Sequence, residues 1–562
     1  MHPRVSRTDP ARDPALATLA LSPGAVAEAS ELALIQRGSV PEPAPSVSDA
    51  VNDLAGHSPD RVAFVGSGGR TTYGQLRDRV ARLRALLLDR GCEPGDRVAV
   101  SGPRSLDNPV AFLALESLGA TYVPVDHRWP VERLSRIFAQ NECAYVLVHE
   151  VRHEEEAEGE YRALASTLLK AAAETDVELL RMSEAAGHGP SPLPWSPRRC
   201  ADRQARYVIH TSGSSGTPKG AVVEHRGMAN HLRHMVDALG LTSADVVAFS
   251  APPTYVVSIW QMLAALTVGA TVAVIDDFDT AHPRRLLKAL AEHRVSIAQL
   301  VPTVLTLVVD DLRRRACDDP LPELRWLIAT GEELRPQLAA RVLDALPNTH
   351  LMNAYGMSEC SDDVAQHVVR REDTQRPRLP VGRPIANTAL HVLVEQDENW
   401  RPARPGETGE LFVGGLPVGG GYVGAETGRT PVFFHDEVDP ASPTQRLYRT
   451  GDLACVEDGL AFCLGRADRQ VKVRGMRIDL GEIEATLRQH PCLVHCAVTA
   501  EAAQETQRLL IHYVAAEDVH PKTLQEFLDG RYVTGLPAHW VRLREMPLMR
   551  NGKIDYRALA GR

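Results

Sequence analysis

The sequence predicts an α/β protein that passes into a β-rich segment and ends in a small α+β unit. Apolar strands alternate with amphipathic helices from about residue 50 to 390, and short β segments punctuated by Gly and Pro follow over 390–465. This alternation is typical of a parallel sheet covered on both faces. A chain of 562 residues corresponds to about three or four domain-sized units.

The α/β alternation opens with a helix over 72–90. Apolar residues recur at spacings of four, three and four from Leu76 to Leu87, which places them on one helix face, and Gly91 suits the position after a helix end. The elements expected next are a strand, a helix and a strand over 98–100, 108–118 and 120–125. Residues 150–200 are acidic and then Pro-rich, and we interpret them as a solvated surface insertion before the pattern resumes at Tyr207.

The β-rich segment and the C-terminal unit complete the expected organisation. Regularly spaced β segments predict a small β-barrel or distorted sheet over about 390–465. The elements expected beyond residue 469 are a helix, two strands and a helix, over 478–489, 494–499, 509–514 and 524–528. Residues 1–45 are rich in Ala, Pro and Ser and are expected to form a flexible N-terminal arm.

Composition excludes a collagen-like, fully disordered or disulfide-scaffold chain. Hydrophobic residues make up 44% and charged residues 24% of the chain, as in ordinary globular proteins, and the formal net charge is −10. An acidic chain has no general attraction to nucleic acid or to anionic membranes. Nine cysteines without a CxxC pair, no signal peptide and no long apolar run favour a cytoplasmic protein with free thiols.

The most informative segment is 207–225, which reads YVIHTSGSSGTPKGAVVEH. A Gly-, Ser- and Thr-rich run with one lysine lies between two apolar β segments, and such a loop directs backbone N–H groups and hydroxyls at an anion. The GxxxxGK[ST] pattern of Walker-type NTPases is absent. The alternative, a flexible linker, is disfavoured by the flanking β segments. We therefore expect a phosphate-binding loop.

This loop resembles the signature of the adenylate-forming (ANL) superfamily, and further motifs follow in the family's order. They read NAYGMSE over 353–359, YRTGD over 448–452, GRADRQVKVRG over 465–475 with RIDLGEIE over 477–484, and NGKID over 551–555. Their wording is similar to the adenylation domains of nonribosomal peptide synthetases rather than to fatty acyl-CoA ligases, and the chain resembles a stand-alone domain of that type.

The resemblance implies a fold and a reaction. The expected fold is a large core over 46–467, with two α/β subdomains plus the small β-barrel, followed by a small mobile α+β lid over 468–562. The expected cofactors are ATP and Mg²⁺. A carboxylate attacks the α-phosphate of ATP and expels pyrophosphate, and a thiol then takes the acyl group and releases AMP.

The resemblance also assigns the nucleotide site. The residues expected to bind phosphates are Thr211, Ser212, Gly213, Ser214, Ser215, Gly216, Thr217 and Lys219. Tyr355 is expected to pack on the adenine and Asp452 to accept hydrogen bonds from the ribose hydroxyls. Arg466 is expected to reach the ribose or phosphates, Gly331 to line the site, and Glu359 to bind Mg²⁺.

Lys553 resembles the catalytic lysine of the family, whose ammonium bridges the substrate carboxylate and the α-phosphate region. A surface lysine in a turn is the alternative that its local sequence alone would favour. Thr211 and Glu359 are the other expected catalytic residues. Asp468 resembles the hinge residue of the lid, and the segment 472–475 is expected to face the site during thiol transfer.

Three departures from the family pattern leave every catalytic group in place. They are His210, Ser215 and the pair Met357-Ser358, where the family more often has Tyr, Thr and Pro-Thr. We therefore expect an active enzyme. A non-catalytic nucleotide sensor or scaffold is the alternative, and it leaves the presence of Lys553, Glu359 and Asp452 unexplained.

The family's substrate pocket aligns with nine positions. They are Val256, Val257, Trp260, Gln299, Ile328, Thr330, Ala354, Asp362 and Asp363. Amino-acid-activating members bind the α-ammonium with an Asp where this chain has Val256, and an unpaired buried charge there would be costly. The adjacent acids, with Asp363 preferred, are expected to receive a cation displaced from the α position; an acid that faces solvent or caps a helix is the alternative.

This pocket resembles those that take β-alanine, although such pockets tend to have an Asp at the position of Val257. We expect a β-amino or other non-α-amino acid, with a basic, polar, aryl or hydroxy acid as the runner-up. The chain ends shortly after Lys553, so we expect a stand-alone enzyme that loads the phosphopantetheine thiol of a separate carrier protein in specialised metabolism such as antibiotic biosynthesis. CoA or an amine is the rival acceptor, and an MbtH-like helper is compatible. No nucleic-acid or membrane partner is expected.

Overall fold

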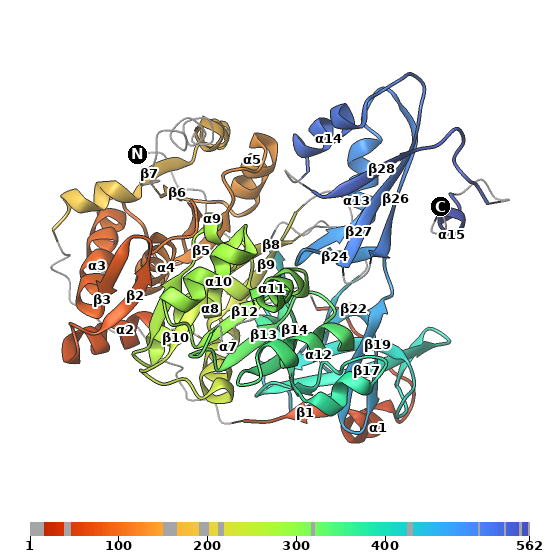
Figure 1. Ribbon diagram of the computed structural model, residues 1–562, viewed down its shortest axis with the longest axis horizontal. Coiled ribbons are helices and arrows are strands. Elements are labelled where there is room, and N and C mark those ends of the chain that lie inside the picture. Colours follow the sequence, from red (N-terminus) through yellow and green to blue (C-terminus); the bar gives the residue numbers. More distant parts are fainter. Residues whose placement is uncertain are drawn as a thin grey trace.

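The structure is a computed structural model. It describes residues 16–38, 46–149, 166–189, 202–211, 218–315, 321–423, 431–503, 506–532, 536–549 and 554–559. Two mixed β-sheets enclose a layer of helices, and further helices cover their outer faces (Figure 1). The predicted α/β class is confirmed, and it is realised as two sheets.

A nine-stranded sheet forms one side of the core, in the order β16-β15-β14-β13-β12-β10-β11-β2-β3. Strands β14 to β2 run parallel, and antiparallel strands lie at both edges. Its strands are β2 (Val62–Gly66), β3 (Gly69–Thr72), β10 (Val246–Phe249), β11 (Thr271–Val274), β12 (Ile297–Leu300), β13 (Trp326–Ala329), β14 (His350–Met357), β15 (Asp362–Val369) and β16 (Arg383–Pro384). Val247 faces the inner helices and Ala248 the outer ones, so β10 is apolar on both faces.

A seven-stranded sheet, in the order β20-β9-β8-β5-β4-β6-β7, forms the other side. Its strands are β4 (Arg97–Ser101), β5 (Thr121–Val125), β6 (Tyr145–Val148), β7 (Glu178–Arg181), β8 (Ala205–Thr211), β9 (Lys219–Glu224) and β20 (Tyr422–Val423). Strand β7 pairs with β6 in parallel, so part of the stretch interpreted as a solvated insertion is an edge strand of the core. Residues 150–165 and 190–201 lie outside the described part.

Helices pack between and outside the two sheets. The helices and 3₁₀ turns of the core are α2 (Val47–His57), α3 (Tyr73–Asp89), α4 (Asp107–Leu118), α5 (Val131–Gln140), η1 (Met182–Gly187), α7 (His225–Leu239), α8 (Val257–Thr267), α9 (Asp277–Thr280), α10 (Pro283–Glu292), α11 (Pro302–Arg315), α12 (Pro336–Ala345), η2 (Ser358–Cys360) and η3 (Arg371–Gln375). Helix α3 begins with a capping box between Thr72 and Gln75, and Gly91 adopts φ 79° just after its end, as predicted.

The β-rich segment forms a third, antiparallel sheet. Its strands are β1 (Leu34–Gln36), β17 (Thr388–Gln396), β18 (Asn399–Pro402), β19 (Gly409–Gly415), β21 (Phe433–His435), β22 (Arg446–Glu457) and β23 (Leu460–Arg466). Residues 16–36, within the predicted arm, are anchored on it. Strand β1 pairs with β17, Leu19 is buried among its aromatic side chains, and α1 (Ala25–Leu32) packs beside β18.

The C-terminal elements form a separate small layer above the core (Figure 1). They are β24 (Gln470–Val473), β25 (Met476–Asp479), α13 (Leu480–Leu487), β26 (Leu493–Ala503), β27 (Thr506–Ala515), α14 (Pro521–Asp529), β28 (Ala538–Arg542) and α15 (Tyr556–Leu559). The predicted helix over 478–489 is too long at its start, because Ile478 belongs to β25 and Asp479 caps α13 by accepting a hydrogen bond from the Gly481 N–H.

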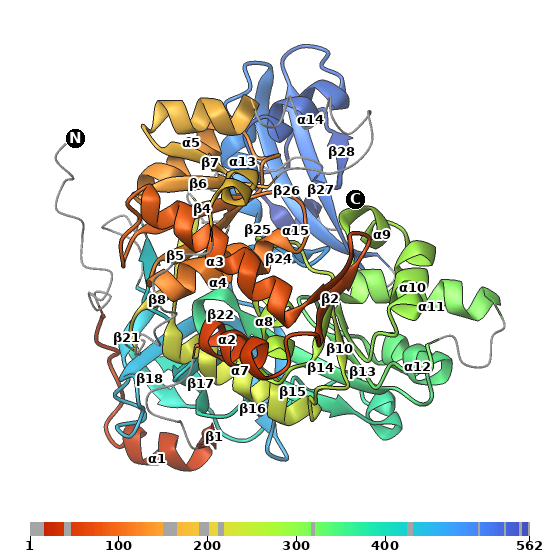
Figure 2. The same cartoon turned by 90° about the vertical axis from the view of Figure 1, so that its left-hand side faces the viewer.

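The C-terminal layer contacts the core beside α5. The Arg133 guanidinium donates to the Tyr532 carbonyl oxygen at 3.1 Å, and α5 lies close to the C-terminal elements in Figure 2. Within the described ranges, no helix is long and apolar enough to cross a membrane.

Candidate active site

One cluster of predicted nucleotide-site residues lies where β14, β22 and β23 meet. The Tyr355 hydroxyl donates to Asp452 Oδ2, and Arg466 Nη1 donates to Asp452 Oδ1 at 2.8 Å. Burial raises the pKa of Tyr355 well above its ordinary value, and the Asp452 carboxylate adds to this, so the phenol stays a hydrogen-bond donor. Each Asp452 oxygen has a second lone pair, so the carboxylate can still accept the hydroxyls of a ribose.

A second cluster surrounds Glu359. The Tyr422 hydroxyl donates to Glu359 Oε1 at 2.6 Å, and Arg477 Nη1 lies 3.2 and 3.3 Å from the two carboxylate oxygens. Burial alone would raise the pKa of Glu359, but the Arg477 guanidinium and the Tyr422 hydroxyl outweigh it and hold that pKa below its ordinary value. Glu359 is therefore a buried, ionised carboxylate.

Glu359 is the kind of oxygen ligand that binds Mg²⁺ together with a nucleotide, although in this arrangement Arg477 faces both of its oxygens. Mg²⁺ prefers hard oxygen ligands and is commonly held by one or two carboxylates plus substrate phosphates. The described residues contain no group of three or more His, Cys, Asp or Glu side chains that could hold a metal by themselves. Glu359 would thus supply one ligand, and the phosphates of ATP would supply others.

The structure describes the predicted phosphate-binding loop at its two ends. Thr211, at the end of β8, pairs with Lys219, at the start of β9, so the loop joins two neighbouring antiparallel strands. Lys219 Nζ lies 5.4 Å from the centre of the Tyr422 ring, next to the Glu359 cluster. The predicted phosphate ligands Ser212, Gly213, Ser214, Ser215, Gly216 and Thr217 lie outside the described residues.

The β24–β25 hairpin of the C-terminal layer reaches into this site. The Gly475 N–H donates to Glu332 Oε1 at 3.0 Å, and the other Glu332 oxygen accepts from the Thr303 backbone and hydroxyl at the start of α11. A Cβ at Gly331 would lie 3.6 Å from the Gly475 Cα, so the two glycines face each other closely. Lys472 Nζ lies 5.7 Å from the centre of the Tyr355 ring. The hairpin therefore closes over the predicted nucleotide residues.

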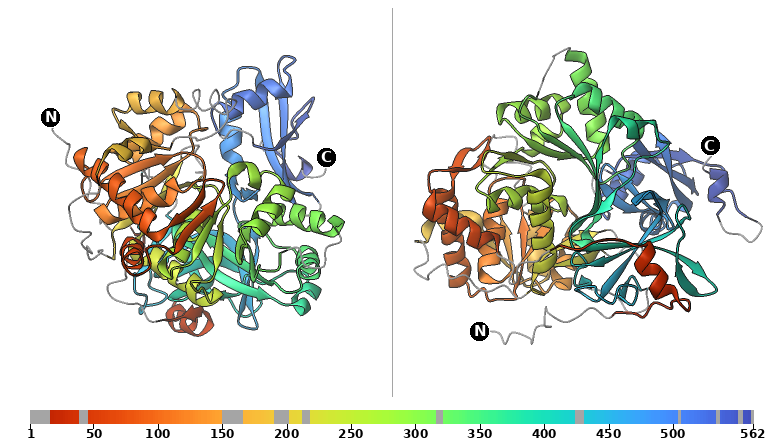
Figure 3. Two further views of the ribbon diagram at one scale, coloured as in Figure 1. Left: turned by 60° about the vertical axis from the view of Figure 1, so that its left-hand side comes forward. Right: turned by 90° about the horizontal axis from the view of Figure 1, so that it is seen from below.

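The predicted hinge residue Asp468 lies between β23 and β24, where the core joins the C-terminal layer. Arg466 Nε and Nη2 donate to its two carboxylate oxygens at 2.7 and 2.8 Å. At the other end of the layer, α15 lies at its outer edge, remote from the core (Figures 1 and 3). Lys553 lies outside the described residues.

Most of the predicted substrate-pocket residues gather where α7 and α8 face the nine-stranded sheet. The Trp260 indole N–H donates to Gln299 Oε1, and Gln299 pairs with Ile328 across neighbouring strands. Val256 and Val257 lie at the start of α8. Ala354 on β14 is buried, and Thr330 follows β13 directly. The structure therefore brings these side chains to one end of the sheet.

Asp362 and Asp363 occupy the start of β15 and point to different neighbours. Asp362 is 5% and Asp363 0% exposed, and Asp362 Oδ2 and Asp363 Oδ1 have no hydrogen-bond partner. Burial, and then Asp363, raise the pKa of Asp362 well above its ordinary value, although Lys472 acts against this. Within the described chain, no Lys or Arg lies within ion-pair distance of either carboxylate; His231 Nε2 is 3.8 Å from Asp363 Oδ2.

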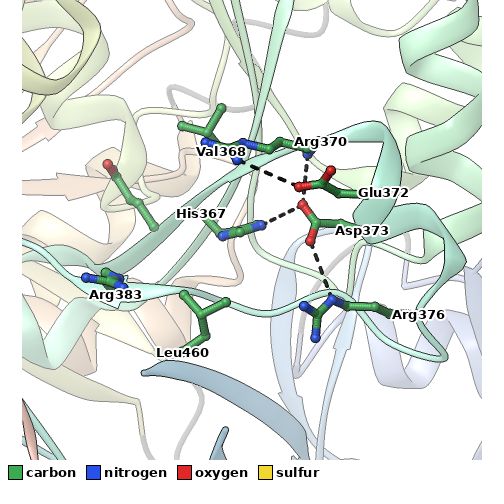
Figure 4. Close-up of a pocket in the computed structure, with 9 residues that line it drawn as sticks. His367, Val368, Arg370, Glu372, Asp373, Arg376, Arg383 and Leu460 are labelled. Carbon is green, nitrogen blue, oxygen red and sulfur yellow. Dashed lines mark hydrogen bonds and ion pairs between the residues drawn. The ribbon is translucent and has the colours of Figure 1, made fainter. Parts of the chain in front are cut away.

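A cavity of about 410 Å³ opens beside the second half of β15, where Gln366, His367 and Val368 line it (Figure 4). His367 Nε2 lies 2.9 Å and Arg376 Nε 3.5 Å from Asp373, while Arg370 pairs with Glu372, so its charged side chains largely balance one another. None of the predicted nucleotide or substrate-pocket residues lines it. It therefore lies outside the predicted site residues, although Gln366, which lines it, donates a hydrogen bond to Asp363.

Three contributors to the site were not predicted: Tyr422, Glu332 and the role of Arg477 as the partner of Glu359. Arg477 was visible within the RIDLGEIE motif, so its charge could have suggested a carboxylate partner. Tyr422 follows a run of glycines, and Glu332 follows Gly331. Neither carries a local signal, because each acquires its role through strands and helices distant in sequence.

Comparison with known proteins agrees with this geometry. The AMP-binding enzyme family matches residues 52–423. Phosphinothricin tripeptide synthetase PhsB of Streptomyces viridochromogenes is 34% identical over 527 residues, which cover 92% of this chain and 42% of that protein. Tyrocidine synthase 1 of Brevibacillus parabrevis is 32% identical over 524 residues, covering 92% and 45%. The chain thus spans less than half the length of these relatives.

Solved structures share the fold. A four-domain nonribosomal peptide synthetase bound to AMP and glycine has a TM-score of 0.65 and 27% identity, with 93% of this chain and 37% of that one covered. The amide bond synthetase McbA from Marinactinospora thermotolerans has a TM-score of 0.76 at 21% identity, covering 92% and 99%. The fold, the clustered motif residues and the family match together show that this chain belongs to the AMP-binding enzyme family of the adenylate-forming superfamily.

Proposed function

We propose that this protein activates a carboxylic acid that carries an amino group away from the α position. The acid's carboxylate oxygen attacks the α-phosphorus of ATP, a P–O bond forms, and pyrophosphate leaves with the electron pair of the broken bond. The acyl-adenylate then reacts with a thiol, and AMP leaves. The family membership and the two clusters around Asp452 and Glu359 support the first step.

Several residues that face the nucleotide would together neutralise the negative charge on its phosphate oxygens. Fixed donors and cations lower the barrier when they face the oxygens on which negative charge builds. We assign this role to the loop over 211–219, to Lys553, and to Mg²⁺ held by Glu359 and the phosphates. Asp452 and Arg466 would hold the ribose end, with Tyr355 beside the adenine.

The unpaired oxygens of Asp362 and Asp363 are the observation that carries the substrate assignment. An ionised carboxylate buried without a cation is costly, so Asp362 favours its neutral form, and a ligand that brings an ammonium would supply the pair with a charge partner. At the position where amino-acid-activating relatives have an Asp, Val256 offers an α-ammonium no charge. The pocket thus favours a β-amino or other non-α-amino acid.

We propose thiol transfer to a carrier protein as the second step, with the lid over 468–562 turning on Asp468 relative to the core over 46–467. The hairpin contacts at Glu332, Tyr355 and Glu359 support an arrangement in which this lid covers the site while α15 is remote from it. Some of the similar proteins contain adenylation and PCP domains. A phosphopantetheine thiol on a separate carrier, with or without an MbtH-like helper, is therefore our preferred acceptor.

Acid-dependent exchange of labelled pyrophosphate into ATP tests the first step. The panel should contain α-, β- and γ-amino acids, together with basic, aryl and hydroxy acids. We expect exchange with β- or γ-amino acids and little with α-amino acids. Exchange with α-amino acids alone would refute the pocket assignment, and no exchange with any acid would refute the proposed activity.

Mass spectrometry of the acylated product tests the second step. The activated acid is offered in parallel to holo-carrier protein, to CoA and to a simple amine. We expect the thioester on the carrier. Product on CoA would identify an acyl-CoA ligase, and product on the amine an amide-forming ligase, with the same adenylation step in both cases.

A further inference from the structure

A β-bulge in strand β15 sets the direction in which the Asp363 side chain points. In the β14–β15 register, Tyr355 pairs with Ala365 but Gly356 pairs with Asp363, so Val364 is skipped. A Cβ at Gly356 would lie 2.0 Å from the Asp362 carbonyl oxygen, so a side chain there would not permit this close approach. A bulge inserts one extra residue and re-aims the side chains beyond it.

The bulge places Asp363 and Gln366 on the same face of the sheet. Residues three apart on a regular strand point to opposite faces. Here Asp363 and Gln366 pair with Gly356 and Ala354, which are two apart on β14 and therefore share a face. That face is the one covered by α7, and Ala354 is itself a predicted pocket residue.

A directed chain of hydrogen bonds runs from α7 to Asp363. The Ala386 N–H donates to His234 Nδ1 at 3.4 Å, so the ring proton lies on Nε2, which donates to Gln366 Oε1 at 3.0 Å. Gln366 Nε2 must then be the donor to Asp363 Oδ2, at 3.2 Å. Burial lowers the pKa of His234, which keeps this neutral tautomer.

This chain of hydrogen bonds uses one oxygen of the Asp363 carboxylate and leaves the other without a partner. Asp363 Oδ2 accepts from Gln366 and faces His231 Nε2 at 3.8 Å, while Oδ1 is buried with no hydrogen-bond partner. A guanidinium binds a carboxylate best through both oxygens, whereas an ammonium is a compact charge that one oxygen can hold.

We propose that Gln366, held by His234, is a positioning residue that fixes Asp363 with Oδ1 toward the substrate and so selects an ammonium over a guanidinium. The inference rests on the proposed function, because it takes Asp363 as the group that receives the substrate's cation. Neither Gln366 nor His234 belongs to the predicted pocket set.

The test compares Gln366→Met, which keeps length and loses the donor, with wild type in pyrophosphate exchange. The probes are β-alanine with its uncharged isostere butanoate, γ-aminobutyrate with pentanoate, and β-guanidinopropionate. We expect the KM for the better amino substrate to rise about tenfold, since a hydrogen bond to a charged group is lost. The KM for the matching isostere and the kcat should change less than about twofold.

Two further comparisons separate positioning from a general structural role. In an Asp363→Asn background, Gln366→Met should add little, because the two residues act as one unit. His234→Gln retains a donor and should stay near wild type, whereas His234→Phe should raise the KM for the amino substrate about threefold. Val368→Thr, at an exposed position of β15, is the matched control.

The outcomes are distinct. Wild-type preference for the ammonium over the guanidinium substrate, with a KM effect confined to the amino substrate, supports the proposal. Equal effects of Gln366→Met on the amino acid and its isostere, or an undiminished effect in the Asp363→Asn background, overturns it while leaving the proposed function standing. Wild-type exchange that excludes every amino-bearing probe overturns both.

Discussion

The candidate site contains two pairs of buried carboxylates. The two pairs differ in the hydrogen-bond and charge partners that the protein gives them. Glu359 and Asp452 each accept a tyrosine hydroxyl and face an arginine. Asp362 and Asp363 each retain an unpaired oxygen. Burial is common to all four, so burial alone does not identify a binding group. The unpaired oxygens distinguish the acidic pair, for which we propose a ligand, from the carboxylates that the protein pairs itself.

The largest expected effect comes from removing the predicted catalytic lysine, which acts on the nucleotide. Lys553→Ala should lower the rate of pyrophosphate exchange by about two to three orders of magnitude, because the variant loses the cation that we propose acts on the reacting phosphate. The loss should be similar for every acid in the panel, with thermal unfolding unchanged. Exchange at the wild-type rate would remove Lys553 from the mechanism.

Substitutions in the acidic pair of the substrate pocket should affect some acids more than others. Asp363→Asn should raise the KM for an amino-bearing acid by about tenfold to a hundredfold, as expected for a lost hydrogen bond between charged groups. Its neutral isostere should be affected less than about twofold. Asp362→Asn should have a smaller effect, because the raised pKa of Asp362 already favours its neutral form. Equal effects on both acids would place Asp363 outside the ammonium site.

The arginine of the lid offers a way to sharpen the comparison. Arg477→Gln leaves Glu359 buried without its charge partner in the arrangement seen here, so transfer from preformed acyl-adenylate to a thiol should slow by about tenfold. Exchange should fall less. Rapid-quench measurement of thioester formation tests this, with Arg488→Gln on the same lid as the control. Equal loss in both half-reactions would contradict a role specific to this lid arrangement.

The smallest effect concerns His210, a buried group that the chain keeps uncharged. Burial, reinforced by Arg133, lowers the pKa of His210 to about 3. The unfolded chain gains a proton near pH 6.5 while the folded chain does not, so stability falls as pH drops below that value. Between pH 7.5 and 5.5 this costs about 1.4 kcal/mol. Urea unfolding should show that loss reduced in His210→Gln; an unchanged pH dependence would contradict it.

Short motifs, read through the family resemblance, indicated one part of the candidate site. Glu359, Asp452 and Arg466 lie within such motifs, and the structure places them in two adjoining clusters. The apolar strands and the capped helix α3 were likewise predictable, because periodicity and capping are local. The helix start at Leu480 was missed because the apolar Ile478 fits either a strand or a helix.

The rest depends on contacts between distant segments. Tyr422 reaches Glu359 only because β20 pairs with β9 beside the phosphate loop. Gln366 reaches Asp363 only because β15 contains a bulge, and a spacing of three predicts opposite faces on a regular strand. No residue pattern in the sequence indicates either contact.

Calorimetry with paired, non-hydrolysable acyl-adenylate analogues tests most directly whether the acidic pair is an ammonium site. Each pair consists of an amino-bearing acyl sulfamoyl-adenosine, β-alanyl or γ-aminobutyryl, and its counterpart with a methyl group in place of the ammonium. At least one amino-bearing analogue should bind about tenfold or more tightly than its counterpart, and Asp363→Asn should abolish that difference. Equal affinities within both pairs would contradict the account.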